Sequence, residues 1–450
     1  MLKSGKFACR PEGYQQVLPE PPSGGMILLL CAKGAAKIKR KKGSISMEFK
    51  YDFTDVGFIQ SREGSHTNAV DRIPIPGASI KEGFSKIPMW VADMNFPTCP
   101  AIPEAIIERA KQPHYGYFYQ PQEFYDGIIK WQETRHGVTG LTKEGIGYEN
   151  GVLGGVVSAL NIFCQKGDNV LLHSPTYIGF TGCITNNGYK IVHSPLYRDA
   201  EGVWRMDYED MEKKIVDNHI HATVFCNPHN PSGRVWTKEE LEKAYEIFKK
   251  HDVMVVADEI WADMILRGHT FQSTAMTNED AKMRTITISA PSKTFNLAGL
   301  VGSYRMVYNP KLIDQMNKET SLSHYDSMNV LWMAAQIAAY GPEGYEWTDE
   351  LCEVLSDNVD YAYDYIIKHF EGVKLAKPEG TYLLYLDCTE WCEKHNITID
   401  ELQRKGVEVG VVWQDGRPFH GPNSIRINLA VPTELVKEAM DRLDKYVFNA

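Results

Sequence analysis

The sequence predicts an α/β protein: a large domain with a mostly parallel sheet flanked by helices, followed by a smaller α+β domain. With 450 residues, the chain has room for two or three domains. From about residue 97 to 330, short β-branched runs alternate with helical segments, and long helices with a few alternating strands follow. Alternation of strands and helices implies crossover connections, and crossovers build parallel sheets.

Four apolar runs are predicted to be strands of the large sheet. Each run is apolar throughout, which is typical of parallel strands that are covered on both faces. The runs lie at residues 170–172, 222–225, 253–256 and 285–288.

Two helices of the large domain are predicted from the spacing of their apolar residues. Residues 121–136 place Phe124, Ile128 and Trp131 on one face. In residues 238–251 the apolar positions recur at helical spacing, and Thr237 and Glu240 form the N-terminal pattern of a capping box. The second segment therefore begins directly after Thr237.

The C-terminal part has a different pattern, which predicts the smaller domain over residues 331–450, after a large domain over residues 97–330. A long helix is expected at 345–370 and a terminal helix at 433–448. Alternating apolar residues predict two strands, at residues 381–386 and 424–429.

The N-terminal 46 residues differ from the rest of the chain. They carry nine Lys or Arg against two Glu, a net charge of +7, and show no sustained periodicity. We interpret residues 1–46 either as a disordered basic tail or as a non-native extension, with Met47 as the true start. Residues 47–96 are expected to form a segment that packs on the smaller domain.

Composition narrows the class of protein. The net charge of −10 argues against nucleic acid as a partner. The longest apolar run near the start, residues 26–30, is far shorter than the about 20 residues that span a membrane. Nine scattered cysteines show no zinc-binding spacing, so we expect a cytoplasmic protein with reduced thiols and no metal.

Three polar clusters follow three of the predicted strands. They are residues 227–233 (Asn-Pro-His-Asn-Pro-Ser-Gly), Asp258-Glu259 and Ser292-Lys293. Ligands of open α/β sheets bind beyond the carboxyl ends of the strands. The three clusters are therefore expected to converge on one site.

The order of these and other residues resembles that of the class I/II aminotransferase superfamily (PLP fold type I), and most closely its cystathionine β-lyase, or C–S lyase, branch. The resemblance extends from about residue 50 to 448 and follows the succession Tyr117, Gly155, Tyr177, Asn230, Asp258, Lys293, Arg426. It implies pyridoxal 5′-phosphate (PLP) as cofactor, an L-amino acid as substrate, and a homodimer with shared active sites.

The resemblance assigns the cofactor ring to residues of the three clusters. Lys293 would hold PLP covalently and, once released by substrate, remove the Cα proton. Asp258 would pair with the pyridinium nitrogen and Asn230 would donate to the phenolic oxygen O3′. Tyr177 would stack on the ring as a second catalytic residue, and Trp261 stands where related enzymes have a tyrosine that donates to O3′.

The same resemblance assigns the phosphate to a glycine-rich helix start. Gly155 and Val156 would offer backbone amides there, and Ser292 a hydroxyl. Tyr117 would reach the phosphate of the neighbouring subunit.

The resemblance places the substrate at two segments. Arg426 would hold the α-carboxylate as a bidentate guanidinium pair. Ala92 and Asp93 lie in a segment that would close over the substrate.

Departures from the aminotransferase pattern favour the lyase branch. Val301 stands where typical aminotransferases have an arginine for the phosphate, and Ala290 and Trp261 also differ from the usual residues. The leading prediction is a β-lyase that cleaves L-cystathionine or other cysteine S-conjugates to a thiol, pyruvate and ammonia. An aminotransferase of an L-amino acid and a PLP-binding regulatory protein remain alternatives, the latter without a recognisable helix-turn-helix.

Overall fold

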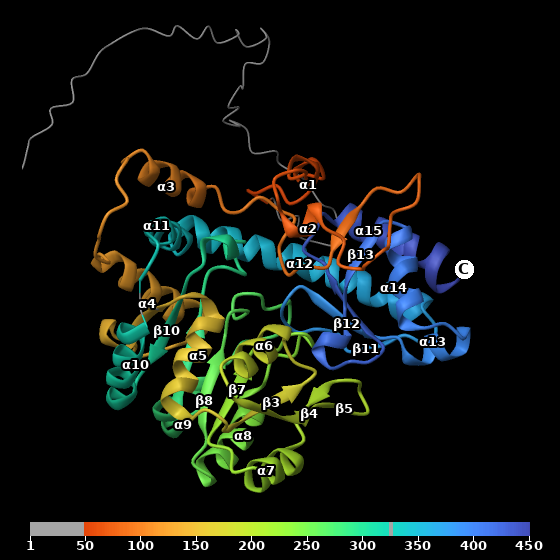
Figure 1. The fold of residues 1–450 in the computed structure, drawn as a ribbon. Coiled ribbons are helices and arrows are strands. Elements are labelled where there is room, and N and C mark those ends of the chain that lie inside the picture. Colours follow the sequence, from red (N-terminus) through yellow and green to blue (C-terminus); the bar gives the residue numbers. More distant parts are fainter. Residues whose placement is uncertain (1–48, 324–326) are drawn as a thin grey trace, which may run out of the picture.

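Seven strands form the larger of two main sheets in the computed structural model, which describes residues 49–323 and 327–450 (Figure 1). The predicted extension at residues 1–46 lies outside the described residues. In spatial order the strands are β2 (Ile146–Glu149), β10 (Ser303–Val307), β9 (Thr285–Ser289), β8 (Met254–Asp258), β7 (Ala222–Cys226), β3 (Asn169–Ser174) and β4 (Lys190–Pro195). The sheet is mostly parallel, as predicted, since β10 is the one strand of the seven that runs opposite to the other six.

Helices cover both faces of this sheet. On one face α5 (Gly151–Phe163), α6 (Ile178–Asn186) and α10 (Pro310–Ser323) pack on alternate strand residues such as Val170. On the other face α7 (Tyr208–Asp217), α8 (Lys238–Lys250) and α9 (Glu279–Arg284) pack on the residues between them, such as Leu171. Because side chains of a strand alternate between faces, two apolar layers require the continuous apolar runs seen in the sequence.

The smaller sheet has five strands and lies beside the large one (Figure 1). Its spatial order is β1 (Ile87–Met89), β13 (Val411–Asp415), β14 (Ser424–Asn428), β12 (Leu383–Asp387) and β11 (Lys374–Leu375). The edge strand β1 comes from the N-terminal segment and pairs in parallel with β13. A third, two-stranded sheet joins β5 (Tyr197–Arg198) and β6 (Trp204–Arg205).

The remaining helices connect or cover the sheets. They are α1 (Gly57–Ser61), α2 (Asn68–Asp71), α3 (Ala101–Ala110), α4 (Gln122–His136), α11 (Val330–Ala339), α12 (Pro342–His369), α13 (Thr389–His395), α14 (Ile399–Glu408) and α15 (Thr433–Leu443). A π-helical turn over Asp444–Phe448 continues α15 to the end of the predicted terminal helix.

Most sequence-predicted elements lie within a few residues of their observed bounds, and the capping box of α8 is present. One strand begins later than predicted. Thr381 has a φ of 68°, so the chain turns there and β12 starts at Leu383. The amide of Thr381 donates instead to the carbonyl oxygen of Met264, at 2.7 Å, which ties the start of β12 to the large domain.

Residues 49–323 and 327–450 share three further properties. No helix there is long and apolar enough to cross a membrane. No group of three or more metal-ligating side chains occurs in these ranges. The seven cysteines that they contain are free.

Candidate active site

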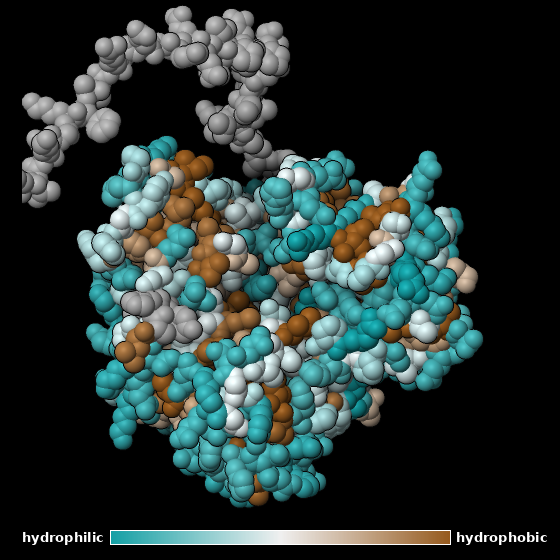
Figure 2. Space-filling model, viewed as in Figure 1, coloured by the Kyte–Doolittle hydropathy of each residue, from teal (hydrophilic) through white to brown (hydrophobic). Residues whose placement is uncertain are grey.

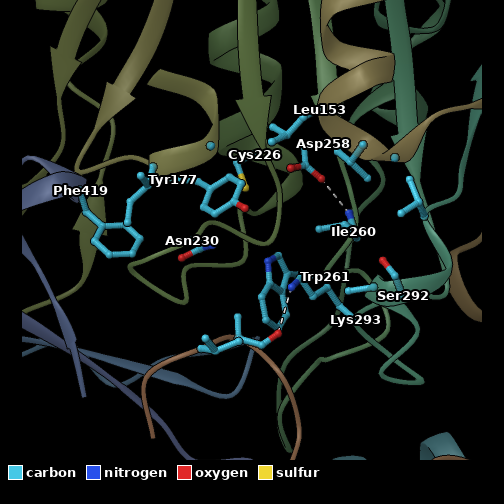
Figure 3. A pocket seen from close by; sticks show the side chains of 18 of the residues that line it. Leu153, Tyr177, Cys226, Asn230, Asp258, Ile260, Trp261, Ser292, Lys293 and Phe419 are labelled. Carbon is cyan, nitrogen blue, oxygen red and sulfur yellow. Dashed lines mark hydrogen bonds between the residues drawn. The ribbon is translucent and has the colours of Figure 1, made fainter. Parts of the chain in front are cut away.

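A cavity of about 620 Å³ lies between the two main sheets, where the large sheet presents the carboxyl ends of its parallel strands. Figure 2 shows the hollow between the two halves of the molecule. The lining combines residues of both sheets, of the loops and helix starts that follow their strands, and of the segment directly after β1. These residues are Val91, Ala92, Asn150, Gly151, Val152, Leu153, Tyr177, Ile178, Gly179, Cys226, Asn230, Asp258, Ile260, Trp261, Ser292, Lys293, Ala298, Val301, Gly302, Gln414, Phe419 and Arg426. The three predicted clusters therefore contribute to one site, as Figure 3 shows.

Lys293 follows β9 and extends its amine into the cavity (Figure 3). Nζ donates a hydrogen bond to the carbonyl oxygen of Ala92, at 2.9 Å. The hydroxyl of Tyr382 donates to the same oxygen, at 3.0 Å. Burial lowers the pKa of the Lys293 amine, because the interior disfavours its charged form.

Asp258 is the last residue of β8 and is 3% exposed. Its Oδ1 accepts a hydrogen bond from the amide of Ile260, at 3.0 Å. Burial raises the pKa of this carboxyl to about 7. No salt bridge to Asp258 is present in the described part of the chain, so a ligand with a protonated nitrogen would supply the missing partner.

Arg426 enters the cavity from β14 and is also buried, at 4% exposure. One Nη atom donates to Oδ1 of Asn230, at 3.1 Å, and the other to the carbonyl oxygen of Trp90, at 3.2 Å. The guanidinium lies 4.6 Å from the ring centroid of Phe419. Its buried Nε atom has no hydrogen-bond partner, and burial lowers the pKa of Arg426 to about 10. A carboxylate ligand would satisfy both the charge and the open donor.

Tyr177 precedes α6 and lines the cavity together with Ser292 and Trp261 (Figure 3). Burial raises the pKa of the Tyr177 phenol, so the hydroxyl keeps its proton at neutral pH. The Trp261 ring lies under the lysine, with Nζ of Lys293 5.7 Å from its centroid. These residues place aromatic surface on the cavity walls.

The N-terminus of α5 forms another part of the lining. Asn150 precedes the helix, and Gly151, Val152 and Leu153 are its first residues. Gly151 has a φ of 73°, a conformation that favours glycine. Because the first amides of a helix have no partner within it, this end can bind an anion such as a phosphate.

The residues predicted for the anion site lie one turn farther along α5 than those at the cavity. Gly155 and Val156 lie in the second turn of α5, outside the cavity lining, and both are buried. A Cβ at Gly155 would lie 2.9 Å from the side chain of Ile288 in β9. That glycine allows α5 to approach the sheet, and Gly151 and Val152 are the residues at the cavity.

Two further predicted residues lie outside this cavity. Tyr117 is in the segment between α3 and α4 and is fully exposed. Asp93 is absent from the lining, and its carbonyl oxygen accepts a hydrogen bond from Nδ2 of Asn428, at 2.7 Å. Its neighbour Ala92 lines the cavity and contacts Lys293 through its carbonyl oxygen.

Several residues of the site have no local signal in the sequence. Tyr382 contacts the carbonyl oxygen that holds Lys293, and Phe419 covers the Arg426 guanidinium. Gln414 lies opposite Arg426 in the β13–β14 pairing. The pairing of β13 with β14 would have been enough to predict Gln414 as a site residue, since directly opposed residues share a face of the sheet.

The charged groups fit a PLP molecule with a bound amino acid. A protonated ring nitrogen would pair with Asp258, an aldehyde would react with Lys293, and a phosphate would lie at the N-terminus of α5. Arg426 would remain for a carboxylate.

Comparison with known proteins agrees with this geometry. Residues 85–443 match the family described as aminotransferase class I and II. The chain is 33% identical over 362 residues to cystathionine β-lyase PatB of Bacillus subtilis (strain 168), a match that covers 79% of this chain and 91% of that protein. It is 29% identical over 360 residues to the cystathionine β-lyase of Corynebacterium glutamicum, covering 79% of this chain and 92% of that protein.

A solved structure shows the same fold. The PLP-bound C–S lyase of Staphylococcus hominis aligns with a TM-score of 0.78 at 30% identity, covering 88% of this chain and 98% of that one. The predicted fold class, PLP fold type I with a large mostly parallel sheet, is thereby confirmed. With most of its length matched in sequence and in structure, the chain belongs to the class I and II aminotransferase family.

Proposed function

We propose that this chain is a PLP-dependent C–S β-lyase that converts cysteine S-conjugates, L-cystathionine among them, to a thiol, pyruvate and ammonia. The observation that carries the proposal is the meeting of Asp258, Lys293 and Arg426 in one cavity, where neither Asp258 nor Arg426 has an oppositely charged protein partner within the described residues. The names of the relatives in B. subtilis, C. glutamicum and S. hominis support it.

When bound, PLP supplies an electron sink for the negative charge that develops at the substrate Cα. Asp258 keeps the ring nitrogen protonated, because a buried carboxylate and a cation stabilise each other. Arg426 binds the α-carboxylate and so fixes the orientation of the Cα–H bond. Tyr177 and Trp261 would supply aromatic surface around the ring, and the Asn230 amide would donate to the phenolic oxygen O3′.

Lys293 accepts the Cα proton. The lowered pKa of its amine increases the neutral fraction that is able to take a proton. The Cβ–S bond then breaks and the sulfur leaves as a thiol after gaining a proton. Water hydrolyses the remaining three-carbon enamine to pyruvate and ammonia, so atoms balance without an oxidant or a keto acid.

The cavity favours elimination over transamination with 2-oxoglutarate. Among the described residues that line it, Arg426 is the one guanidinium and Lys293 the one ammonium. A dicarboxylic keto acid would need a second cation for its distal carboxylate.

An assay of the PLP-loaded protein separates these activities. Pyruvate and thiol formed from L-cystathionine or S-alkyl-L-cysteines without added keto acid support the lyase. Strict dependence on 2-oxoglutarate would replace it by the aminotransferase. Bound cofactor with no turnover of either kind would favour the regulatory alternative.

The assignment of Lys293 has its own test. Lys293→Ala should abolish the covalently bound, borohydride-reducible form of the cofactor, as measured by visible absorbance and mass spectrometry. A reducible adduct that persists in this variant would disprove the assignment. Lys282→Ala, at a lysine outside the cavity, serves as the control and should keep the adduct.

We also propose that the chain forms a homodimer. The segment between α3 and α4 exposes Tyr115, Tyr117 and Tyr119 at 60%, 111% and 82%, and Ile107 of α3 at 53%. Figure 2 shows hydrophobic residues gathered over and beneath α3. An exposed apolar patch of this kind is typical of an interface, and a second copy would let Tyr117 reach the phosphate end of the partner's cavity.

A further inference from the structure

The leaving group would lie in the part of the cavity next to Lys293 and Arg426. Under the proposed function, Asp258 and Lys293 hold the cofactor and Arg426 holds the α-carboxylate. Of the other lining residues, Ala92, Trp261, Gln414 and Phe419 lie against Lys293 or Arg426. Val91 and Ile260, which also line the cavity, are next to Ala92 and Trp261 in the chain. We call these six residues the leaving-group wall.

The leaving-group wall has no charged side chain. Gln414 is its one amide, and its Nε2 makes a long hydrogen bond of 3.4 Å to the carbonyl oxygen of Asp415. The register of β13 and β14 places Gln414 directly opposite Arg426. Opposed residues of an antiparallel pair point to the same face, so the amide lies beside the carboxylate site.

The nearest charged residues along the chain do not replace the missing charge. Asp415 accepts hydrogen bonds from the Arg417 guanidinium, at 2.7 to 3.1 Å, and both side chains lie outside the lining. Asp93 also lies outside it. The segment proposed to reach a partner's cavity, residues 112–120, contains His114 and no lysine or arginine.

We propose that this enzyme prefers cysteine S-conjugates whose leaving thiol is uncharged, over conjugates such as cystathionine that carry a distal carboxylate and ammonium, and that Gln414 is the specificity-determining residue. The inference rests on the proposed function. Its physical reason is that a charged group placed against Ile260, Trp261 and Phe419 loses hydration without gaining a partner. An alkyl group of the same shape has no favourable hydration to lose there, and it gains apolar contact.

A pair of isosteric thioethers tests the preference in catalysis. S-(3-methylbutyl)-L-cysteine and S-(2-carboxyethyl)-L-cysteine have leaving groups of the same shape, and only the second is charged. With the PLP-loaded protein we expect kcat/KM to be at least about tenfold higher for the uncharged member. Equal values, or a higher value for the charged member, would overturn the inference.

A second pair tests the same preference without turnover. In 2-amino-7-methyloctanoate and 2-aminopimelate, both as L-isomers, a methylene replaces the sulfur, so neither can eliminate. Calorimetric titration of the PLP-loaded protein should show at least about tenfold tighter binding of the uncharged member. If both thioethers fail to yield pyruvate while this difference is present, the lyase function falls and the binding preference stands. If pyruvate forms and the two amino acids of the second pair bind equally well, the lyase function stands and the binding preference falls.

Substitutions at Gln414 test the position. Gln414→Lys places an ammonium beside the leaving group, and we expect it to reduce the binding ratio of the second pair by at least about fivefold. Gln414→Met is the matched control, because it keeps the wall neutral and should keep the uncharged ligand preferred. An unchanged ratio in a Gln414→Lys variant that still binds PLP would show that Gln414 does not face the leaving group.

Discussion

At the scale of single residues, Asp258 is a carboxyl that is buried even in the protein without its proposed partner, the protonated ring nitrogen of PLP. Burial raises its pKa from 3.8 to about 7. The folded protein without cofactor therefore binds more protons at this site than the unfolded chain does between about pH 4 and 7. Stability should fall as pH rises through this window, by up to about 4 kcal/mol for a shift of this size.

Denaturant unfolding of the cofactor-free protein at pH 5 and pH 8 measures this effect. Asp258→Asn should remove most of the loss between the two pH values, because the amide does not titrate. Asp252→Asn, at a carboxylate that is 94% exposed, should leave the loss unchanged. An identical pH dependence in the Asp258→Asn variant would contradict the assigned cause.

Val301 has an unfavourable backbone conformation at the cavity. Its φ is 45° and its ψ 89°, in a region that β-branched residues rarely adopt, and its side chain is 49% exposed. Val301→Gly should therefore raise the free energy of unfolding by about 1 kcal/mol, which thermal or urea unfolding can measure. Val301→Ala should gain little, because alanine keeps the Cβ. A destabilised glycine variant would show that the Val301 side chain contributes more than its conformation costs.

At the scale of elements, the approach of α5 to the large sheet sets the position of the anion site. A Cβ at Gly155 would lie 2.9 Å from Ile288 and 3.1 Å from the side chain of Glu149. Gly155→Ala should displace the helix, lower the free energy of unfolding by roughly 1–3 kcal/mol and weaken PLP binding. Urea unfolding and a titration with PLP measure the two effects.

A matched control for this substitution lies in the next helix. Gly182 is in α6, and a Cβ there would meet no atom within 4 Å. Gly182→Ala should stabilise the protein by roughly 0.5–1 kcal/mol, since alanine is the better helix former. If both variants behaved alike, close packing of α5 would not be the reason for the glycine.

At the scale of the whole molecule, the site exists because two sheets and the N-terminal segment meet. The amide of Thr176 donates to the carbonyl oxygen of Phe419, at 3.0 Å, and Arg426 binds Asn230 and the carbonyl of Trp90. The proposed dimer would extend this assembly to a second copy through Tyr117.

Mixing two inactive or weakened variants tests the shared site. Co-expressed Lys293→Ala and Tyr117→Ala chains should form mixed dimers in which one of the two sites has both residues. With random association, activity should recover to about a quarter of the wild-type value. A mixture that is no more active than its components, or a monomer in sedimentation at micromolar concentration, would contradict the shared site.

The pattern of the sequence was sufficient for four of the seven strands of the large sheet and for the polar residues at the ends of three of them. Continuous apolar runs predicted β3, β7, β8 and β9, because strands covered on both faces leave no polar position. The sequence order then predicted that Asn230, Asp258 and Lys293 would converge, since parallel strands present their carboxyl ends at one edge. Apolar runs are local properties and the order of the strands is a topological one, so both can be predicted from the amino-acid sequence.

Other parts of the site depend on contacts between distant segments. The start of α5 contains several glycines, and the fold decides that Gly151 lines the cavity while Gly155 packs on Ile288. The turn at Thr381, which makes β12 begin only at Leu383, likewise depends on a distant segment. The amide of Thr381 donates a hydrogen bond to the carbonyl oxygen of Met264.

The sequence by itself determined the fold class, the strand-end residues and the chemistry they imply, because burial pattern and residue type are properties of short segments. The tertiary structure decided which groups lack partners and which walls are neutral. Arg426 meets Trp90 across 336 positions of sequence and Lys293 meets Ala92 across 201. Whether a buried charge is satisfied depends on such neighbours, and those neighbours are set by the packing of the whole chain.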